Sequence, residues 1–168
     1  VDYGQNMALP AFHKEQPGCA YYYSPLNIYD CGVVDQAFLD ENGQITNLLY
    51  AHVYHEGEGK KGANNVVSLV YKTLFLNNLL RAGEPGKELN IIYDNCSGQN
   101  KNNTVLKFAI WLTEMGYFKQ VNFVFLIVGH TKNAADRLFN CLKVQYRRQN
   151  IYTMDQLLHV LDDSPKVS

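Results

Sequence analysis

The sequence predicts an α/β fold with a mixed, five-stranded sheet: an antiparallel β-meander is followed by alternating helices and strands, with helices on both faces. Two observations predict this fold. Apolar residues in the first third of the chain lie in runs bounded by turn residues, which is typical of strands. Further along, apolar residues recur at the three- and four-residue spacing of helices, which alternate with two short and almost wholly apolar runs.

The first part of the chain predicts the meander. Its three strands are expected at residues 1–9, 26–38 and 45–55. The first strand carries Asp2 and is broken at Pro10, because proline has no backbone N–H to donate. The pair Asn42-Gly43 readily takes positive φ, so residues 39–44 are expected to form the turn between the second and third strands.

The rest of the chain predicts alternating helices and strands. Helices are expected at residues 65–80, 103–116, 134–148 and 153–161, and strands at residues 89–93 and 121–128. Val67, Val70 and Leu74 give the first helix its apolar stripe, and Gly116 marks the end of the second. Residues 1–161 are therefore predicted to form a single domain, and residues 162–168 a loose tail.

This order of elements is that of a ribonuclease H-like fold. A right-handed crossover places the strand at residues 89–93 parallel to the first strand, so Asp2 and Asp94 are expected side by side. The helix after the last strand carries Asp136 in its first turn. Three converging carboxylates can hold two divalent cations for in-line phosphoryl displacement. The pattern thus predicts a metal-dependent site at one edge of the sheet.

Each acid also has a structural interpretation. Asp2 can be a polar residue near a frayed end, and Asp94 can be a turn former that bonds its own backbone. Asp136 suits the first turn of a helix that Asn133 caps. Any one of these interpretations suffices for one residue, but the presence of all three acids on matching elements favours the functional interpretation.

Two segments carry a family resemblance. Residues 94–102 read Asp-Asn-Cys-Ser-Gly-Gln-Asn-Lys-Asn, and residues 129–139 read Gly-His-Thr-Lys-Asn-Ala-Ala-Asp-Arg-Leu-Phe. Together they resemble the signature of transposon-derived, ribonuclease H-like domains of the DDE/DDD transposase and integrase kind. The resemblance extends from the Asp-Tyr-Gly-Gln opening to about Tyr152. It implies metal-dependent cleavage or joining of DNA by Asp2, Asp94 and Asp136, with two Mg²⁺ or Mn²⁺ ions, and a nuclear location.

The chain departs from that family pattern in two ways. Its third acid is aspartate rather than the commoner glutamate, so the helix that carries Asp136 must approach more closely. The DNA-binding and zinc modules of full transposases are absent from the sequence, which puts autonomous recognition of transposon ends in doubt.

Polar and basic residues around the acids are candidates for contacts with nucleic acid. They are Gln99, Asn100, Lys101, Asn102, Lys132 and Arg137, with Lys143, Arg147 and Arg148 as a basic stripe that can equally be a solvated face. His130 follows the last strand and is a candidate catalytic residue. It can ligate a metal, contact a phosphate or carry a proton to the leaving oxygen, or it can simply cap or hydrogen-bond.

Two other functions remain open. An exonuclease of the same fold usually carries a second acid two residues after the first, where this chain has Gly4. The other alternative is a domesticated, catalytically silent domain that binds nucleic acid or protein. DNA is the expected partner, RNA is not excluded, and the sequence leaves open whether the chain forms a homo-oligomer.

Other patterns carry less weight. His52 and His55 lie three apart on a predicted strand and so point to opposite faces, which makes a poor chelate. Cys96 with His130 lacks a third group that would orient the base. The glycines and lysines of residues 57–62 lack the full P-loop pattern. The aromatic side chains of Tyr21-Tyr22-Tyr23 can stack on bases, lie exposed in a turn, or pack at the edge of the core.

Composition bounds the class of protein. The formal net charge of -1 means that a nucleic acid would have to be held by a local basic patch. The 4 cysteines show no paired spacing and are interpreted as reduced thiols of an intracellular protein. No apolar run approaches the roughly 20 residues that span a bilayer. The chain opens at Val1-Asp2, already inside a predicted strand, so we expect a domain from a longer protein.

Overall fold

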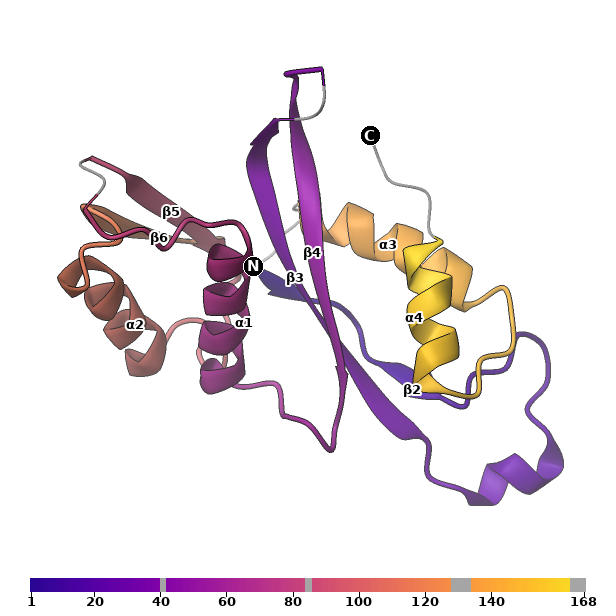
Figure 1. Ribbon diagram of the computed structural model, residues 1–168. Coiled ribbons are helices and arrows are strands. Elements are labelled where there is room, and N and C mark those ends of the chain that lie inside the picture. The colour runs from indigo at the N-terminus through magenta and orange to yellow at the C-terminus, as the bar shows by residue number, and fades with distance from the viewer. Residues whose placement is uncertain (40–41, 84–85, 128–133, 164–168) are drawn as a thin grey trace. The chain divides into compact units, whose positions relative to one another are not determined.

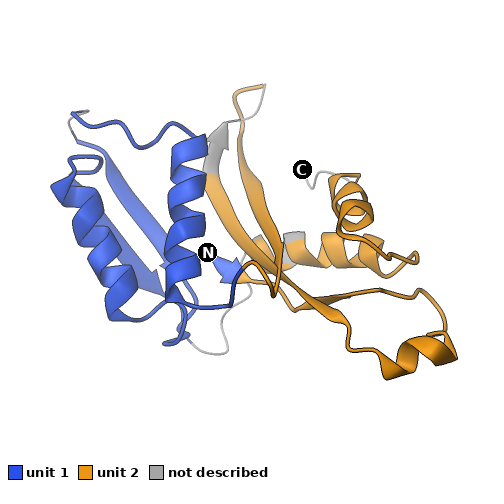
Figure 2. Ribbon diagram, turned by 60° about the horizontal axis from the view of Figure 1, so that its bottom comes forward, with its two compact units in different colours: residues 1–2, 59–132 blue, residues 3–58, 133–168 orange. Residues whose placement is uncertain are grey.

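The computed structural model describes residues 1–39, 42–83, 86–127 and 134–163, and Figure 1 labels its α-helices and all strands except the first. The chain forms two compact units (Figure 2). Unit 1 comprises residues 1–2 and 59–132, and unit 2 comprises residues 3–58 and 133–168. The boundary between the units falls inside the first strand, between Asp2 and Tyr3.

Unit 2 is built on a β-sheet. The strands of this sheet are β1 (Asp2–Tyr3), β2 (Met7–Leu9), β3 (Leu26–Leu39) and β4 (Ile45–His55). β2 and β4 run antiparallel to β3. β3 pairs with each of the others, and Ile28 lies opposite Met7 on β2 and opposite His55 on β4. Gly43 has a φ of 74° in the turn before β4, the conformation that glycine adopts without a steric penalty. The predicted antiparallel pairing of the second and third strands is therefore confirmed.

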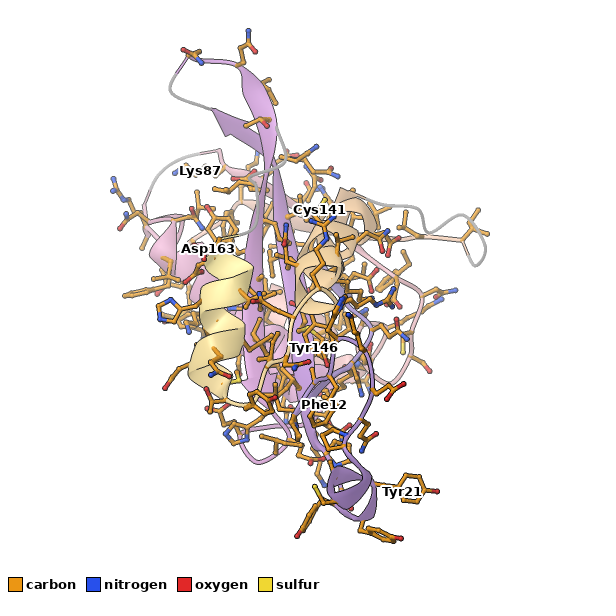
Figure 3. All side chains as sticks on the ribbon, turned by 90° about the vertical axis from the view of Figure 1, so that its right-hand side faces the viewer. Phe12, Tyr21, Lys87, Cys141, Tyr146 and Asp163 are labelled. Carbon is orange, nitrogen blue, oxygen red and sulfur yellow. The ribbon has the colours of Figure 1, made fainter. Side chains whose placement is uncertain are left out.

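The helices of unit 2 are the 3₁₀ helix η1 (Gly18–Tyr22), α3 (Ala134–Tyr146) and α4 (Met154–Asp162). The two α-helices contribute to its core, whereas η1 has no buried residue. The buried cluster consists of Met7, Leu9, Ile28, Ile151 and Leu157. Tyr146, at the end of α3 (Figure 3), donates its hydroxyl to the carbonyl of Ala8 at 2.7 Å and accepts from the N–H of Ala8 at 3.0 Å. This pair of bonds ties α3 to β2.

Two glycines make room for α3 on the sheet. A Cβ atom at Gly32 would lie 2.6 Å from Cζ of Phe139 and 2.9 Å from Cδ1 of Leu49. A Cβ atom at Gly4 would lie 3.4 Å from Cδ1 of the same Phe139 ring. The Phe139 ring is buried, and it packs α3 against the sheet at the two glycines, where no side chain occupies the space.

Unit 1 combines two helices with a short parallel sheet. Its elements are α1 (Ala63–Leu76), β5 (Glu88–Tyr93), α2 (Asn103–Glu114) and β6 (Gln120–Phe125). β5 and β6 pair in parallel from Glu88 opposite Gln120 to Tyr93 opposite Phe125. Ile91 and Tyr93 are buried while Ile92 between them is exposed, which is the alternation of a strand with one covered face. The core residues from the two helices are Val66, Val70, Thr73, Leu74, Val105, Phe108, Ala109 and Leu112.

The ends of the helices follow local backbone chemistry. α2 ends as predicted near Gly116, whose φ is 70°, and the N–H of Tyr117 reaches the carbonyl of Leu112. The predicted end of the first helix at residue 80 is wrong, because α1 stops at Leu76. Asn78 takes a φ of 54° and closes α1 in the same way, with the N–H of Leu79 bonded to the carbonyl of Leu74.

The mixed α/β class is confirmed, whereas the arrangement of the sheet differs from the prediction. The hydrogen-bonded ladders of the described residues form a four-stranded and a two-stranded sheet rather than one of five strands. The apolar run expected as a strand at residues 121–128 is typical of a strand covered on both faces, yet Val124 of β6 is 47% exposed. None of the helices in the described part of the chain combines the length and the apolar character that a membrane span requires.

Candidate functional site

Asp94 follows the last residue of β5, as the sequence predicted. Its Oδ1 atom accepts a hydrogen bond from the backbone N–H of Cys96 at 3.3 Å and another from Nδ2 of Asn100. The bond to Cys96 is the turn-forming contact expected of an aspartate in this position. The second oxygen, Oδ2, accepts no hydrogen bond from any described residue, so one oxygen of this carboxylate builds the turn and the other is open to a ligand.

The loop that begins at Asp94, here called the Asp94 loop (residues 94–102), is held by bonds at both ends. The carbonyl of Cys96 accepts from three successive backbone N–H groups, those of Gln99, Asn100 and Lys101, at 3.3, 2.8 and 3.1 Å. Asn102 caps α2, because its Oδ1 accepts from the N–H groups of Thr104 and Val105 at 3.0 and 3.1 Å. Its Nδ2 donates to the carbonyl of Ser97 at 3.2 Å, which gives Asn102 a structural role in the loop.

Asn100 lies inside the Asp94 loop. Its relative exposure is 2%, and its Oδ1 atom is buried without a hydrogen-bond partner among the described residues. Leaving a buried acceptor unpaired costs about 1–3 kcal/mol, so such an atom in a folded protein calls for an explanation. Asn100 was predicted to contact nucleic acid. In its observed position the side chain donates to Asp94, and the predicted contact of Asn100 with nucleic acid stays a prediction.

Lys101 and Gln99 lie nearer the surface. The ammonium group of Lys101 lies 5.7 Å from the centre of the Phe125 ring, within the range of a cation–π contact. Lys101 is exposed, whereas Gln99 is partly buried. The predicted contacts of these two residues with nucleic acid stay predictions.

The start of the chain lies beside β5. The nitrogen of Val1 donates to the carbonyl of Ile92 at 2.7 Å, and both residues belong to unit 1. Asp2 is the next residue after Val1, and Asp94 follows Ile92 by two positions. This bond therefore brings the segment that carries Asp2 to the strand that carries Asp94.

The remaining predicted residues lie in unit 2 or outside the described residues. Asp136 lies half-buried in the first turn of α3, in unit 2. His130, Lys132 and Asn133 lie outside the described residues, as does the side chain of Arg137. Within the described ranges, no three His, Cys, Asp or Glu side chains are grouped closely enough to hold a metal ion. The predicted roles of Asp136 and His130 stay predictions.

One buried acid was not singled out by the sequence pattern. Asp30 on β3 is only 3% exposed, and its Oδ2 would lie 3.3 Å from a Cβ atom placed on Gly4. A carboxylate thus reaches from the neighbouring strand into the space that a side chain at position 4 would fill. The available signal was an acidic residue between buried positions of a predicted strand, since acids are seldom buried without a partner.

The fold and the Asp94 loop define a mixed α/β protein with a carboxylate at the carboxyl end of a parallel strand. The chain belongs to the family described as Domain of unknown function (DUF7869), whose model matches residues 42–168. No curated protein matches the chain significantly. No solved structure does so either.

Proposed function

We propose that this chain is the catalytic core of a metal-dependent polynucleotidyl transferase of the transposase and integrase kind, with a ribonuclease H-like fold, which cuts or joins DNA. The observation that carries the proposal is the hydrogen bond from Val1 to the carbonyl of Ile92. In a parallel ladder, the N–H group of a residue donates to a carbonyl on the neighbouring strand. The donating residue then lies opposite the residue that follows that carbonyl in the sequence. In such a ladder Val1 would lie opposite Tyr93 and Asp2 opposite Asp94, and this is the arrangement that the proposal requires.

Opposite residues of neighbouring strands point to the same face, and the strands lie about 4.8 Å apart. Two carboxylates at that spacing can share a cation. The donor set supports hard divalent cations such as Mg²⁺ or Mn²⁺, which prefer oxygen ligands. Asp94 offers its Oδ2, which accepts no hydrogen bond from any described residue. When bound, two such cations would activate the attacking oxygen and stabilise the leaving oxygen.

The chain's own residues position the ligands and the substrate. The turn bond from Cys96 and the side chain of Asn100 fix the rotation of the Asp94 carboxylate. Asn102 holds the loop to the start of α2 through its cap. Lys101 is exposed and supplies positive charge for a backbone phosphate. In this proposal Asp136 completes the acidic set, His130 serves proton transfer, and the DNA substrate implies action in the nucleus.

Cleavage of a labelled duplex DNA by the 168-residue chain, with Mg²⁺ or Mn²⁺, tests the proposal. Asp94→Asn keeps the oxygen that accepts from Cys96 but removes the charge, so we expect metal-dependent cleavage to fall at least a hundredfold. The matched control is Asp163→Asn, the same chemical change at an exposed residue after α4. Circular dichroism would show that both variants fold. Equal cleavage by the Asp94→Asn variant and the parent would overturn the mechanism.

A second function is favoured by one observation. The turn bond from Cys96 to Asp94 gives this acid a purely structural task, as in a catalytically silent domain that binds nucleic acid or protein. That function predicts DNA binding with no cleavage under any metal, and Asp94→Asn would leave the binding unchanged. The same set of variants therefore separates the two functions.

A further inference from the structure

We propose that Asn100 is a ligand of the divalent cation held at Asp94, with its side-chain oxygen Oδ1 as the donor atom. This inference rests on the proposed function, because it deepens the description of the same cation site. It assigns to the amide a role that is distinct from the contact with nucleic acid predicted from the sequence.

The first argument is burial. Asn100 is 2% exposed, and its Oδ1 accepts no hydrogen bond from the described residues. Buried polar atoms in folded proteins are almost always paired with protein groups, ordered water or an ion. The unpaired atom is an acceptor, so the missing partner must be a donor or a cation and cannot be an anion.

The second argument is position. Nδ2 of Asn100 donates to Oδ1 of Asp94, and the two atoms of an amide are only two bonds apart. The amide oxygen therefore lies beside the carboxylate. Two neighbouring oxygen acceptors repel each other electrostatically. A cation that lies between them attracts both and outweighs this repulsion. The same amide thus donates to one oxygen of Asp94 through its nitrogen and carries its own unpaired oxygen on the same carbon.

The third argument is that the amide is held in place before any cation binds. The backbone N–H of Asn100 bonds the carbonyl of Cys96 at 2.8 Å, and that carbonyl also fixes the residues on either side. Lys101 is directed to the Phe125 ring, 5.7 Å from its centre, so its ammonium group can balance charge without displacing the amide. Carboxylate and amide oxygens are both ligands that Mg²⁺, Mn²⁺ and Ca²⁺ accept.

Mn²⁺ binding by the full chain, followed by the electron paramagnetic resonance signal of free Mn²⁺, tests this assignment. Asn100→Asp keeps an oxygen at the same place and adds a negative charge to the ligand set. We expect its affinity for Mn²⁺ to rise about tenfold, because ligand charge raises affinity at such sites. Without Mn²⁺ the added charge repels Asp94, so we expect a lower melting temperature that Mn²⁺ restores.

The matched control is Asn95→Asp. It adds the same charge to the same loop, at an exposed residue next to Asp94. We expect its affinity for Mn²⁺ to stay within twofold of the parent. An effect of general charge would appear equally in both variants, whereas coordination by residue 100 appears only in the Asn100→Asp variant.

The remaining outcomes separate this inference from the function on which it rests. Asp94→Asn should lose Mn²⁺ binding. If that variant keeps the affinity of the parent for Mn²⁺, there is no cation site at Asp94. If Asp94→Asn loses binding while Asn100→Asp and Asn95→Asp behave alike, the site stands and the role of Asn100 is overturned. Weaker binding of Mn²⁺ by Asn100→Asp, or a melting temperature that Mn²⁺ does not restore, would also overturn that role.

Discussion

Gly32→Ala tests how α3 is seated on the sheet of unit 2. The new methyl group would lie 2.6 Å from Cζ of Phe139 and 2.9 Å from Cδ1 of Leu49, well inside the usual carbon contact of about 3.5–4.0 Å. Overpacking of a fitted core costs about 1–3 kcal/mol. Because a rigid ring and a second side chain must both move, the upper half of that range applies.

The backbone offsets part of that cost. Gly32 lies within β3 and has no positive φ, so alanine gains about 0.5–1 kcal/mol from the lower entropy of the unfolded chain. The expected net loss is therefore about 1.5 kcal/mol in the free energy of unfolding. Urea unfolding of the full chain, followed by far-ultraviolet circular dichroism, measures this loss.

The matched control is Gly18→Ala. A Cβ atom there meets nothing within 4 Å, so the free energy of unfolding should stay within about 0.5 kcal/mol of that of the parent. The double variant Gly32→Ala with Phe139→Leu should recover about 1 kcal/mol relative to the sum of the two single changes, because leucine gives way to the new methyl group. A parental midpoint for Gly32→Ala, or strict additivity in the cycle, would refute this account of the packing.

Two further predictions concern tyrosines of unit 2. Tyr146→Phe should destabilise the chain by about 2 kcal/mol in urea, because it leaves both the N–H and the carbonyl of Ala8 without their hydroxyl partner. Tyr152→Phe, at an exposed ring, is its control, and equal midpoints for the two variants would disprove the bond pair. Burial and the hydrogen bond to Tyr54 raise the pKa of Tyr3 above its ordinary value of 10.0. In the unfolded chain Tyr3 ionises above about pH 10 while the folded chain keeps its proton, so stability should fall as the pH rises beyond that point. Tyr3→Phe should make that fall shallower, and an unchanged slope would contradict the assignment.

The elements that the sequence predicted best are those with strong local signals. β4 has the bounds that were predicted, because the Asn42-Gly43 pair fixes the preceding turn and an apolar run follows. α1 was predicted too long, since its periodicity continues past Leu76 while the backbone at Asn78 ends the helix. Asparagine takes positive φ only in some contexts, so the sequence alone does not reveal this ending.

In the candidate site, too, some features could be predicted from local sequence and others could not. A carboxylate at the end of a strand could be predicted from the apolar run that stops before Asp94. The direction of each side chain in the loop could not, because it depends on which carbonyl each N–H finds. Asn100 and Asn102 look alike in the sequence, yet one is buried against Asp94 and the other caps α2. Asp30 was missed because its burial depends on packing between strands that are distant in the sequence.

We propose that Asp2 and Asp94 share a divalent cation. The most direct measurement is a crystal structure of the chain with Mn²⁺, in which anomalous scattering at the manganese edge locates the ion. The account predicts an anomalous peak between the carboxylates of Asp2 and Asp94, at about 2.0–2.3 Å from their oxygens. A peak elsewhere, with these two carboxylates turned apart at a Mn²⁺ concentration that supports DNA cleavage, would contradict it.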